Sequence, residues 1–147
     1  MYRKILVPTN GSALSNRGVA EAARLAQALG AELLVLHVRS PLLEPHHVEG
    51  GALSNLGEER IGAEIEDEER KLLETAMEIA ASSGVQAQTA FVADLAPYEA
   101  IIRVSREQHC DLIVMASHAR RGVPAFLIGS DTQKVLTHTA TPVLVVH

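Results

Sequence analysis

Residues 4–38 read KILVPTNGSALSNRGVAEAARLAQALGAELLVLHV and contain the repeating unit of the fold. The run 4–9 is short, apolar and rich in strand formers, and the turn after it offers Ser12 as a helix cap. Apolar residues then recur at helical spacing from Ala13 to Leu29, and the glycine that follows supplies a stop. Residues 32–38 are apolar almost throughout, as in a strand that is covered on both faces. The stretch therefore predicts a strand, a helix and a second strand.

The rest of the chain repeats this alternation after one long irregular segment. Residues 39–57 contain prolines and glycines without a sustained period, which predicts a mobile loop with room for a helical turn. The run 58–83 carries an apolar stripe with its acidic residues on the other side, as in an amphipathic helix, and a glycine ends it. The later expected elements are an edge strand over 85–92, a helix capped by Asp94 that runs to about His109, a buried strand over 110–116, a helix over 130–138 opened by a capping box of Ser130 and Gln133, and a last strand over 142–146.

The composition describes a folded protein of modest size and negative charge. The chain has 147 residues, of which 47% are hydrophobic, enough for a single domain over 1–147 with a core of its own. Its net charge of −5 argues against a general nucleic-acid binder. The apolar runs are too short to span a bilayer and the N-terminus is a poor secretory signal, so we expect a cytoplasmic protein without a membrane partner. Cys110 is the only cysteine, which excludes an intrachain disulfide and indicates a buried small residue.

Strands that alternate with helices imply right-handed crossovers and a mostly parallel sheet between two helical layers. In such α/β folds, ligands bind beyond the carboxyl ends of the central strands, where the strand order reverses. The loops at that edge follow Thr9, Val38, Val92 and Met115. The first and the last of these loops carry most of the polar residues, so the search for a site begins there.

The loop over 117–129 and the helix after it form the strongest candidate for a binding site. The helix start offers free N–H groups, hydroxyls and the positive end of the helix dipole to an anion, and further donors precede it; the residues concerned are Ser117, His118, Arg120, Arg121, Gly129, Ser130 and Thr132. The same Gly-Ser-x-Thr sequence is also ordinary helix capping. Asp131 suits the helix dipole but repels a bound anion unless Mg²⁺ lies between them. The residues alone leave phosphate binding and simple capping both open.

Four stretches together resemble the universal stress protein family. They are KILVPTNGS at 4–12, DLIVMASHAR at 111–120, LIGSDTQKVL at 127–136 and TPVLVV at 141–146, and their order and spacing match the family over nearly the whole chain. The resemblance implies a three-layer α/β/α sandwich, Rossmann-like and similar to the adenine nucleotide alpha-hydrolases, whose five-stranded parallel sheet has the order 3-2-1-4-5. It also implies a homodimer formed through the last strand, here Pro142 to Val146.

One branch of the family binds ATP through a loop that reads Gly, two residues, Gly, nine residues, Gly, then Ser or Thr. In this chain that frame falls on Ala116, Ala119, Gly129 and Ser130, so alanine replaces two of the glycines. An alanine held at positive φ costs about 1–2 kcal/mol and its methyl group can occupy ligand space, whereas at negative φ only the added volume remains. Asn10 stands where ATP-binding relatives usually carry Asp; its neutral amide can hydrogen-bond a base or ribose but is a poorer Mg²⁺ partner.

From this resemblance we expect a universal stress protein of stress response or signalling that binds an adenine nucleotide, with ATP and Mg²⁺ as the candidate cofactor. The expected nucleotide-binding residues are Pro8, Thr9, Asn10, Val38, Met115, Ala116, Ser117, His118, Ala119, Arg120, Gly129, Ser130, Asp131 and Thr132. We expect no residues that bind a metal by themselves and no vigorous catalysis. Slow ATP hydrolysis would need His118 or Asp131 to position a water molecule.

Other functions are weaker candidates. His46 and His47 lie in the Pro/Gly-rich loop, where a surface pair is more common than a zinc site, and no His-Glu-x-x-His motif occurs. A flavin would have little to stack on, because only 3% of the residues are aromatic. A receiver domain would need clustered acids where Asn10 stands. The main alternative is a dimeric interaction module without nucleotide, with the acidic run 58–78 and the loop 39–57 as contact surfaces for protein partners.

Overall fold

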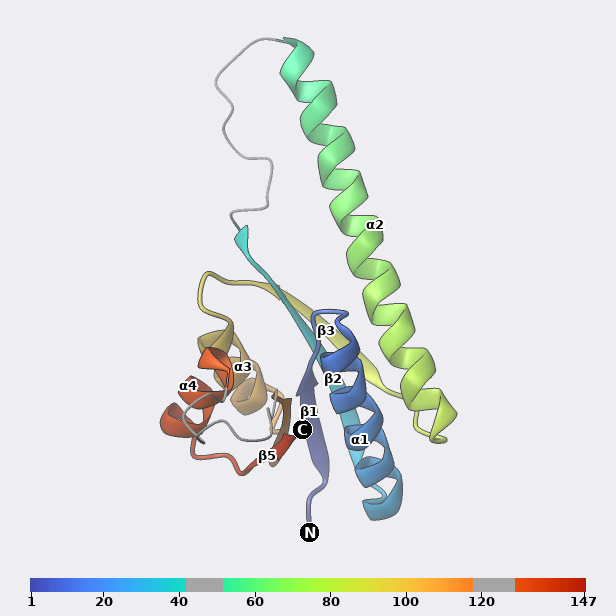
Figure 1. Cartoon of the computed structure of the whole chain (residues 1–147), viewed down its shortest axis with the longest axis vertical. Coiled ribbons are helices and arrows are strands. Elements are labelled where there is room, and N and C mark those ends of the chain that lie inside the picture. Colours follow the sequence, from blue (N-terminus) through green and yellow to red (C-terminus); the bar gives the residue numbers. More distant parts are fainter. Residues whose placement is uncertain (42–51, 118–128) are drawn as a thin grey trace.

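A parallel sheet lies between two layers of helices (Figure 1). The computed structural model describes residues 1–41, 52–117 and 129–147, with the backbone alone for 52–62, and these residues form five strands and four helices. In chain order the elements are β1 (Lys4–Pro8), α1 (Ala13–Leu29), β2 (Glu32–Arg39), α2 (Ala52–Ser82), β3 (Gln88–Ala93), α3 (Pro97–Glu107), β4 (Leu112–Ala116), α4 (Ser130–His138) and β5 (Val143–Val146). The strand order is β3-β2-β1-β4-β5 and every neighbouring pair is parallel. The predicted fold class and strand order are confirmed.

The two faces of the sheet carry separate apolar cores. Alternate residues of a strand point to opposite faces, so Ile5 and Val7 of β1 pack with α1 and α2, while Leu6 packs with α3 and α4. All three side chains are fully buried. Burial on both faces explains why the central strands are nearly continuous apolar runs in the sequence.

Helix α1 begins and ends as its sequence predicts. The Ser12 hydroxyl accepts a hydrogen bond from the Ser15 N–H at 3.1 Å and so caps the first turn. Gly30 ends the helix in the left-handed region, with φ of 65°, where a side chain would be strained. The N-terminal cap holds the loop between β1 and α1 at the carboxyl edge of the sheet.

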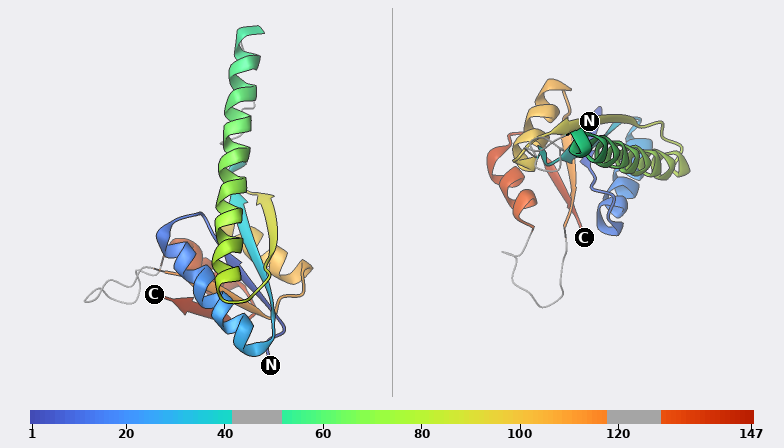
Figure 2. Two further views of the ribbon diagram at one scale, coloured as in Figure 1. Left: turned by 90° about the vertical axis from the view of Figure 1, so that its right-hand side faces the viewer. Right: turned by 90° about the horizontal axis from the view of Figure 1, so that it is seen from above.

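Helix α2 is longer than the sequence predicts. It begins at Ala52, so residues 52–57, expected in the loop over 39–57, are helical instead. Alanine and leucine favour helix strongly there, and one interior glycine at Gly57 costs only about 1 kcal/mol. The first half of α2 projects well beyond the sheet (Figures 1 and 2). In the described part of the chain no helix, α2 included, is both long and apolar enough to cross a membrane.

Strands β3 and β4 begin later than expected, at Gln88 and Leu112 rather than at 85 and 110. In both cases the preceding helix uses the N–H group that would have opened the strand. The Val85 N–H donates to the Ala80 carbonyl at 3.1 Å, and the Cys110 N–H donates to the Ser105 carbonyl at 2.8 Å. These bonds satisfy carbonyls at the ends of α2 and α3. The edge position expected for β3 is confirmed.

The expected cap of α3 is wrong. Because Pro97 occupies the start of the helix, the cap position falls on Ala96 and not on Asp94. The Asp94 carboxylate instead accepts a hydrogen bond from the Ala96 N–H at 3.0 Å and pairs with Arg103 at 3.0 Å. Both contacts hold the pKa of Asp94 below its ordinary value. The hydrogen bond from the Ala96 N–H is the larger cause, and the interaction with Arg103 is the next.

The capping box expected at α4 is also wrong. Gly129 occupies the cap position, and no hydrogen bond from a side chain of the described residues caps the helix there. Ser130 is already the first helical residue, so it cannot exchange capping bonds with Gln133 in the way the sequence suggests. With respect to the described residues, the first turn of α4 therefore has N–H groups at the carboxyl edge of the sheet that no side chain caps.

Candidate functional site

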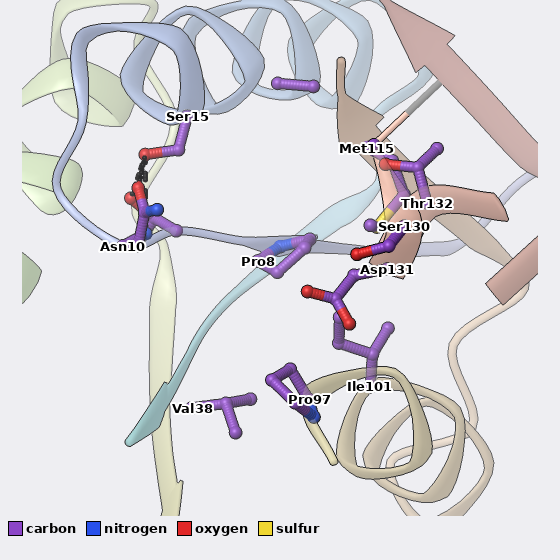
Figure 3. A pocket seen from close by; sticks show the side chains of 13 residues that line it. Pro8, Asn10, Ser15, Val38, Pro97, Ile101, Met115, Ser130, Asp131 and Thr132 are labelled. Carbon is purple, nitrogen blue, oxygen red and sulfur yellow. Dashed lines mark hydrogen bonds between the residues drawn. The ribbon is translucent and has the colours of Figure 1, made fainter. Parts of the chain in front are cut away.

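A pocket opens at the carboxyl edge of the sheet, between the ends of β1 and β4 and the start of α4 (Figure 3). Its volume is about 380 Å³. The strand order reverses here, because β1 pairs with β2 on one side and with β4 on the other. Sheets of this kind bind ligands at such a point. The described residues that line the pocket are Pro8, Thr9, Asn10, Ser15, Val38, Pro97, Ile101, Met115, Ala116, Gly129, Ser130, Asp131 and Thr132.

Most of the residues predicted for the site lie in this pocket. Those from the ends of β1, β2 and β4 and from the start of α4 all line it: Pro8, Thr9, Asn10, Val38, Met115, Ala116, Gly129, Ser130, Asp131 and Thr132. Ser117 is 2% exposed, and its hydroxyl accepts a hydrogen bond from the Gly129 N–H at 3.3 Å, so it supports the start of α4. His118, Ala119, Arg120 and Arg121 lie outside the described residues.

Sequence reasoning missed three lining residues, Ser15, Pro97 and Ile101. Pro97 opens the helix that follows β3, and the carboxyl end of β3 lies at the same edge of the sheet as the pocket. Ile101 lies one turn further along the same face of α3. The sequence places the loop after Val92 at this edge, which indicates that the first turns of the helix beyond it can also line a site there.

The loop between β1 and α1 is held by hydrogen bonds among its own side chains. The Asn10 side-chain oxygen accepts hydrogen bonds from the Ser12 N–H at 3.0 Å and from the Ser15 hydroxyl at 2.9 Å. The Thr9 hydroxyl lies 3.0 Å from that of Ser15 and accepts from the Gly11 N–H at 3.2 Å. Both acceptor positions of the Asn10 oxygen are thus in use, which leaves its NH₂ group as a donor for a ligand.

The same loop is tied to α2 through His37. Its Nδ1 lies 2.9 Å from the Thr9 carbonyl oxygen, and its Nε2 lies 3.6 Å from the Glu69 carboxylate. Glu69 also pairs with Arg39 at 3.4 Å. The exposed fractions of these three side chains are only 12%, 13% and 16%, so solvent screens the interactions weakly. The pocket wall at Thr9 therefore rests on an ion-pair cluster between the sheet and α2.

The opposite side of the pocket is apolar. Pro8, Val38, Pro97 and Ile101 approach one another from three elements (Figure 3), and Met115 lies deeper, at the end of β4. Ile101 and Met115 are nearly fully buried and belong to the core beneath α3 and α4. This wall can accept a flat apolar surface without leaving polar groups unpaired.

The start of α4 supplies the polar end of the pocket. Ser130 is exposed and Asp131 is half-buried, while Thr132 is 4% exposed. The Asp131 carboxylate extends into the space between Pro8 and Ile101 (Figure 3). It is the only charged side chain among the described residues that line the pocket. An anion approaching the free N–H groups of α4 would meet this negative charge.

Ala116 fits the site without backbone strain. Its φ is not positive, since His109 is the only non-glycine residue with positive φ in the described ranges. Its side chain points toward α1, where a Cβ added to Gly18 would lie 3.0 Å from the Ala116 Cβ. Met115, the neighbouring residue, points to the opposite face of the sheet. Ala116 thus borders the pocket while its methyl group packs against α1.

No cluster of metal-ligating side chains forms within the ranges that the structure describes. Cys110 is buried as expected, and burial raises the pKa of its thiol to about 11. At neutral pH the thiol is protonated, so it is a poor nucleophile and metal ligand.

Comparison with known proteins identifies the family. The sequence model of the universal stress protein family matches residues 1–147. The chain belongs to the universal stress protein family. Universal stress protein YxiE of Bacillus subtilis is 34% identical over 99% of both chains. A universal stress protein of Thermus aquaticus is 32% identical, again over 99% of both chains.

Solved structures of universal stress proteins share the fold. The structure of the protein MJ0577 superposes with a TM-score of 0.76 at 25% identity, covering 99% of this chain and 96% of the other. A universal stress protein in complex with cAMP gives a TM-score of 0.70 at 24% identity, covering 99% and 97%. The protein from Archaeoglobus fulgidus in complex with dAMP gives 0.67 at 19% identity, covering 99% and 98%. At these identities the two complexes are evidence for the fold alone.

Proposed function

We propose that this universal stress protein binds an adenine nucleotide in the pocket at the carboxyl edge of its sheet, with ATP among its ligands. The observation that carries the proposal is the convergence of two unlike surfaces on one space. An apolar wall suited to a purine faces the free N–H groups and hydroxyls at the start of α4, which suit a phosphate. The volume of about 380 Å³ is within the usual range for small-molecule sites.

Each part of a nucleotide has a matching surface in the pocket. The base would lie against Pro8, Val38, Pro97 and Ile101, where burial of its faces is favourable. The Asn10 NH₂ group would donate to a base or ribose acceptor, because the Asn10 oxygen is held by the loop. A phosphate would take the N–H groups of the first turn of α4, together with the Ser130 hydroxyl.

Relatives support this assignment of ligand class. Two universal stress proteins of the same fold have been solved with cAMP and with dAMP, both of which are adenine nucleotides. The backbone of this chain also tolerates the alanine at position 116, where ATP-binding relatives carry glycine, because φ is not positive and the methyl group packs against Gly18. For ATP itself, Mg²⁺ would offset the negative charge of Asp131.

Isothermal titration calorimetry with ATP, ADP and AMP, each with and without Mg²⁺, tests the proposal on protein stripped of nucleotide. Val38→Trp adds a bulky side chain to the apolar wall of the pocket and should abolish binding. Met77→Trp, on an exposed position of α2 that does not line the pocket, is the matched control and should bind as the wild type does. Absence of heat with every nucleotide at millimolar concentration, in a protein that melts cooperatively, would refute the proposal.

A dimeric interaction module is the second candidate, and β5 favours it. The strand lies at the edge of the sheet, and Leu144 is 43% exposed there. An exposed apolar edge strand is a template for pairing with a second copy. We infer a homodimer through Pro142 to Val146 for either function. Leu144→Lys should convert it to monomer in sedimentation velocity, and an unchanged sedimentation coefficient would argue against this interface.

A further inference from the structure

The charge distribution of the pocket indicates a charge filter, that is, a selection among ligands by their negative charge. Among the described lining residues, Asp131 carries a negative charge and none carries a positive one. Two arginines of the described residues are engaged outside the pocket: Arg103 pairs with Asp94, and Arg39 pairs with Glu69. A polyphosphate entering this part of the pocket would therefore find a carboxylate without a described counter-charge.

The geometry gives the carboxylate direct access to a ligand. Asp131 is half-buried in the first turn of α4, and its oxygens extend between Pro8 and Ile101 toward the middle of the pocket (Figure 3). Within the parts of the chain that the structure describes, no hydrogen bond or ion pair engages these oxygens. Apolar side chains lie on both sides of the carboxylate, so its charge acts at short range on any ligand that enters the pocket.

The carboxylate also competes with a phosphate for the helix. The positive end of the α4 dipole favours an anion, and Asp131 already supplies one in the first turn. A phosphate bound at the same N–H groups gains less from the dipole and is repelled by the carboxylate. A divalent cation reverses this effect, because carboxylate and phosphate oxygens can share Mg²⁺ as ligands.

We propose that Asp131 determines the ligand specificity of the pocket by discriminating against nucleotides whose phosphate charge is not neutralised. In metal-free solution the pocket prefers adenosine and adenosine monophosphates, and it accepts ATP as the magnesium complex. This inference rests on the proposed adenine-nucleotide site. It assigns to Asp131 a role in the choice among adenine nucleotides, and not in holding the base.

The test compares four titrations: adenosine, AMP, ATP with EDTA, and ATP with Mg²⁺. The quantity of interest is the dissociation constant of metal-free ATP divided by that of adenosine. Asp131→Asn has the same shape without the charge and should lower this ratio roughly tenfold, as removal of one nearby charge in a partly solvated site predicts. The same variant should lose most of the gain in ATP affinity that Mg²⁺ gives the wild type.

Two further variants separate a local effect from a general one. Glu107→Gln removes one negative charge at an exposed position outside the pocket, so it matches the change in net charge and should leave the ratio unaltered. Asp131→Glu keeps the charge and should keep the discrimination. A melting curve for each variant without ligand shows that the fold is intact.

The outcomes distinguish this inference from the proposed function. If nucleotides bind but Asp131→Asn and Glu107→Gln give the wild-type ratio, the filter is overturned and the nucleotide site stands. If neither adenosine nor any nucleotide binds the wild type or Asp131→Asn, the proposed function and the filter fall together. A lower ratio in Asp131→Asn alone supports both.

Discussion

Ala116 of β4 packs directly against Gly18 of α1, where a methyl group added to Gly18 would lie 3.0 Å from the Ala116 methyl carbon. The space between the two backbones holds only one methyl group, and that group belongs to Ala116. A glycine in the helix thus accommodates an alanine at the end of the strand. This contact lies on the α1 face of the sheet. The side chain of Met115, the preceding residue of β4, points to the opposite face.

The contact predicts strong coupling between the two positions. Gly18→Ala should lower the free energy of unfolding by about 1–2 kcal/mol, because overpacking outweighs the better helix propensity of alanine. In an Ala116→Gly background the same substitution should raise it by about 0.5–1 kcal/mol. Urea denaturation of the four proteins measures the cycle. Equal effects of Gly18→Ala in both backgrounds would show that the two positions are not coupled and that the contact is loosely packed.

Asn10→Asp should make ATP binding more dependent on metal. An aspartate keeps acceptors for the Ser12 N–H and the Ser15 hydroxyl, so the loop should hold its shape. It also gives the pocket a second carboxylate in addition to that of Asp131. We expect metal-free ATP to bind roughly threefold to tenfold more weakly and the magnesium complex to bind more tightly. Calorimetry with and without Mg²⁺ tests this, with Gln108→Glu on the exposed end of α3 as the control for added charge.

Glu69→Gln should loosen the attachment of α2 to the sheet. The substitution removes the partner of Arg39 and His37 at a site where all three side chains are largely buried. We expect a loss of about 1–2 kcal/mol in the free energy of unfolding, more than for a surface ion pair. The neighbouring Glu68 is exposed, and Glu68→Gln should cost less than about 0.5 kcal/mol. Similar losses for both variants would contradict a structural role of Glu69.

Stability should decline at alkaline pH partly because of Cys110. Burial raises the pKa of the folded thiol to about 11 from an ordinary value of 9.0, so the unfolded chain loses this proton first. The contribution of the thiol to folding is fully present below pH 9.0 and is lost as pH rises toward 11. It amounts to at most about 2–3 kcal/mol. Urea denaturation from pH 8 to about pH 10.5 should give a shallower decline for Cys110→Ala than for the wild type, and parallel declines would contradict it.

Much of the fold could be predicted because apolar runs and helix stops repeat so regularly. Strands buried on both faces, such as residues 32–38, have a sequence signal that few other elements share. The first and last residues of the helices and strands were harder to predict, because they depend on single backbone hydrogen bonds. Val85 and Cys110 are strand formers in the sequence, yet their N–H groups complete the preceding helices. Gly57 was predicted to be the last residue of the loop before the helix but lies within α2.

The sequence indicates which residues line the pocket where polar residues follow a central strand, and indicates fewer of them where the wall is apolar. Asn10, Ser130 and Asp131 stand out in the sequence because they are polar and lie at the carboxyl ends of central strands or at the start of the helix that follows, although capping alone would also explain such residues. Ile101 carries no such signal, since an apolar residue on a helix is ordinary core. The direction of the Ala116 methyl group depends on its packing against Gly18, a contact between residues far apart in the sequence.

The pairing of β1 with β4 has a consequence for the kinetics of folding. The Asp111 carboxylate, just before β4, accepts hydrogen bonds from the N–H groups of Arg3 and Lys4 at the other end of the chain, at sequence separations of 108 and 107. Such distant partners meet only after a long loop has closed, which is slow and entropically costly. The pocket between these strands is therefore expected to form late. A ligand that binds there should slow unfolding while leaving the rate of refolding almost unchanged.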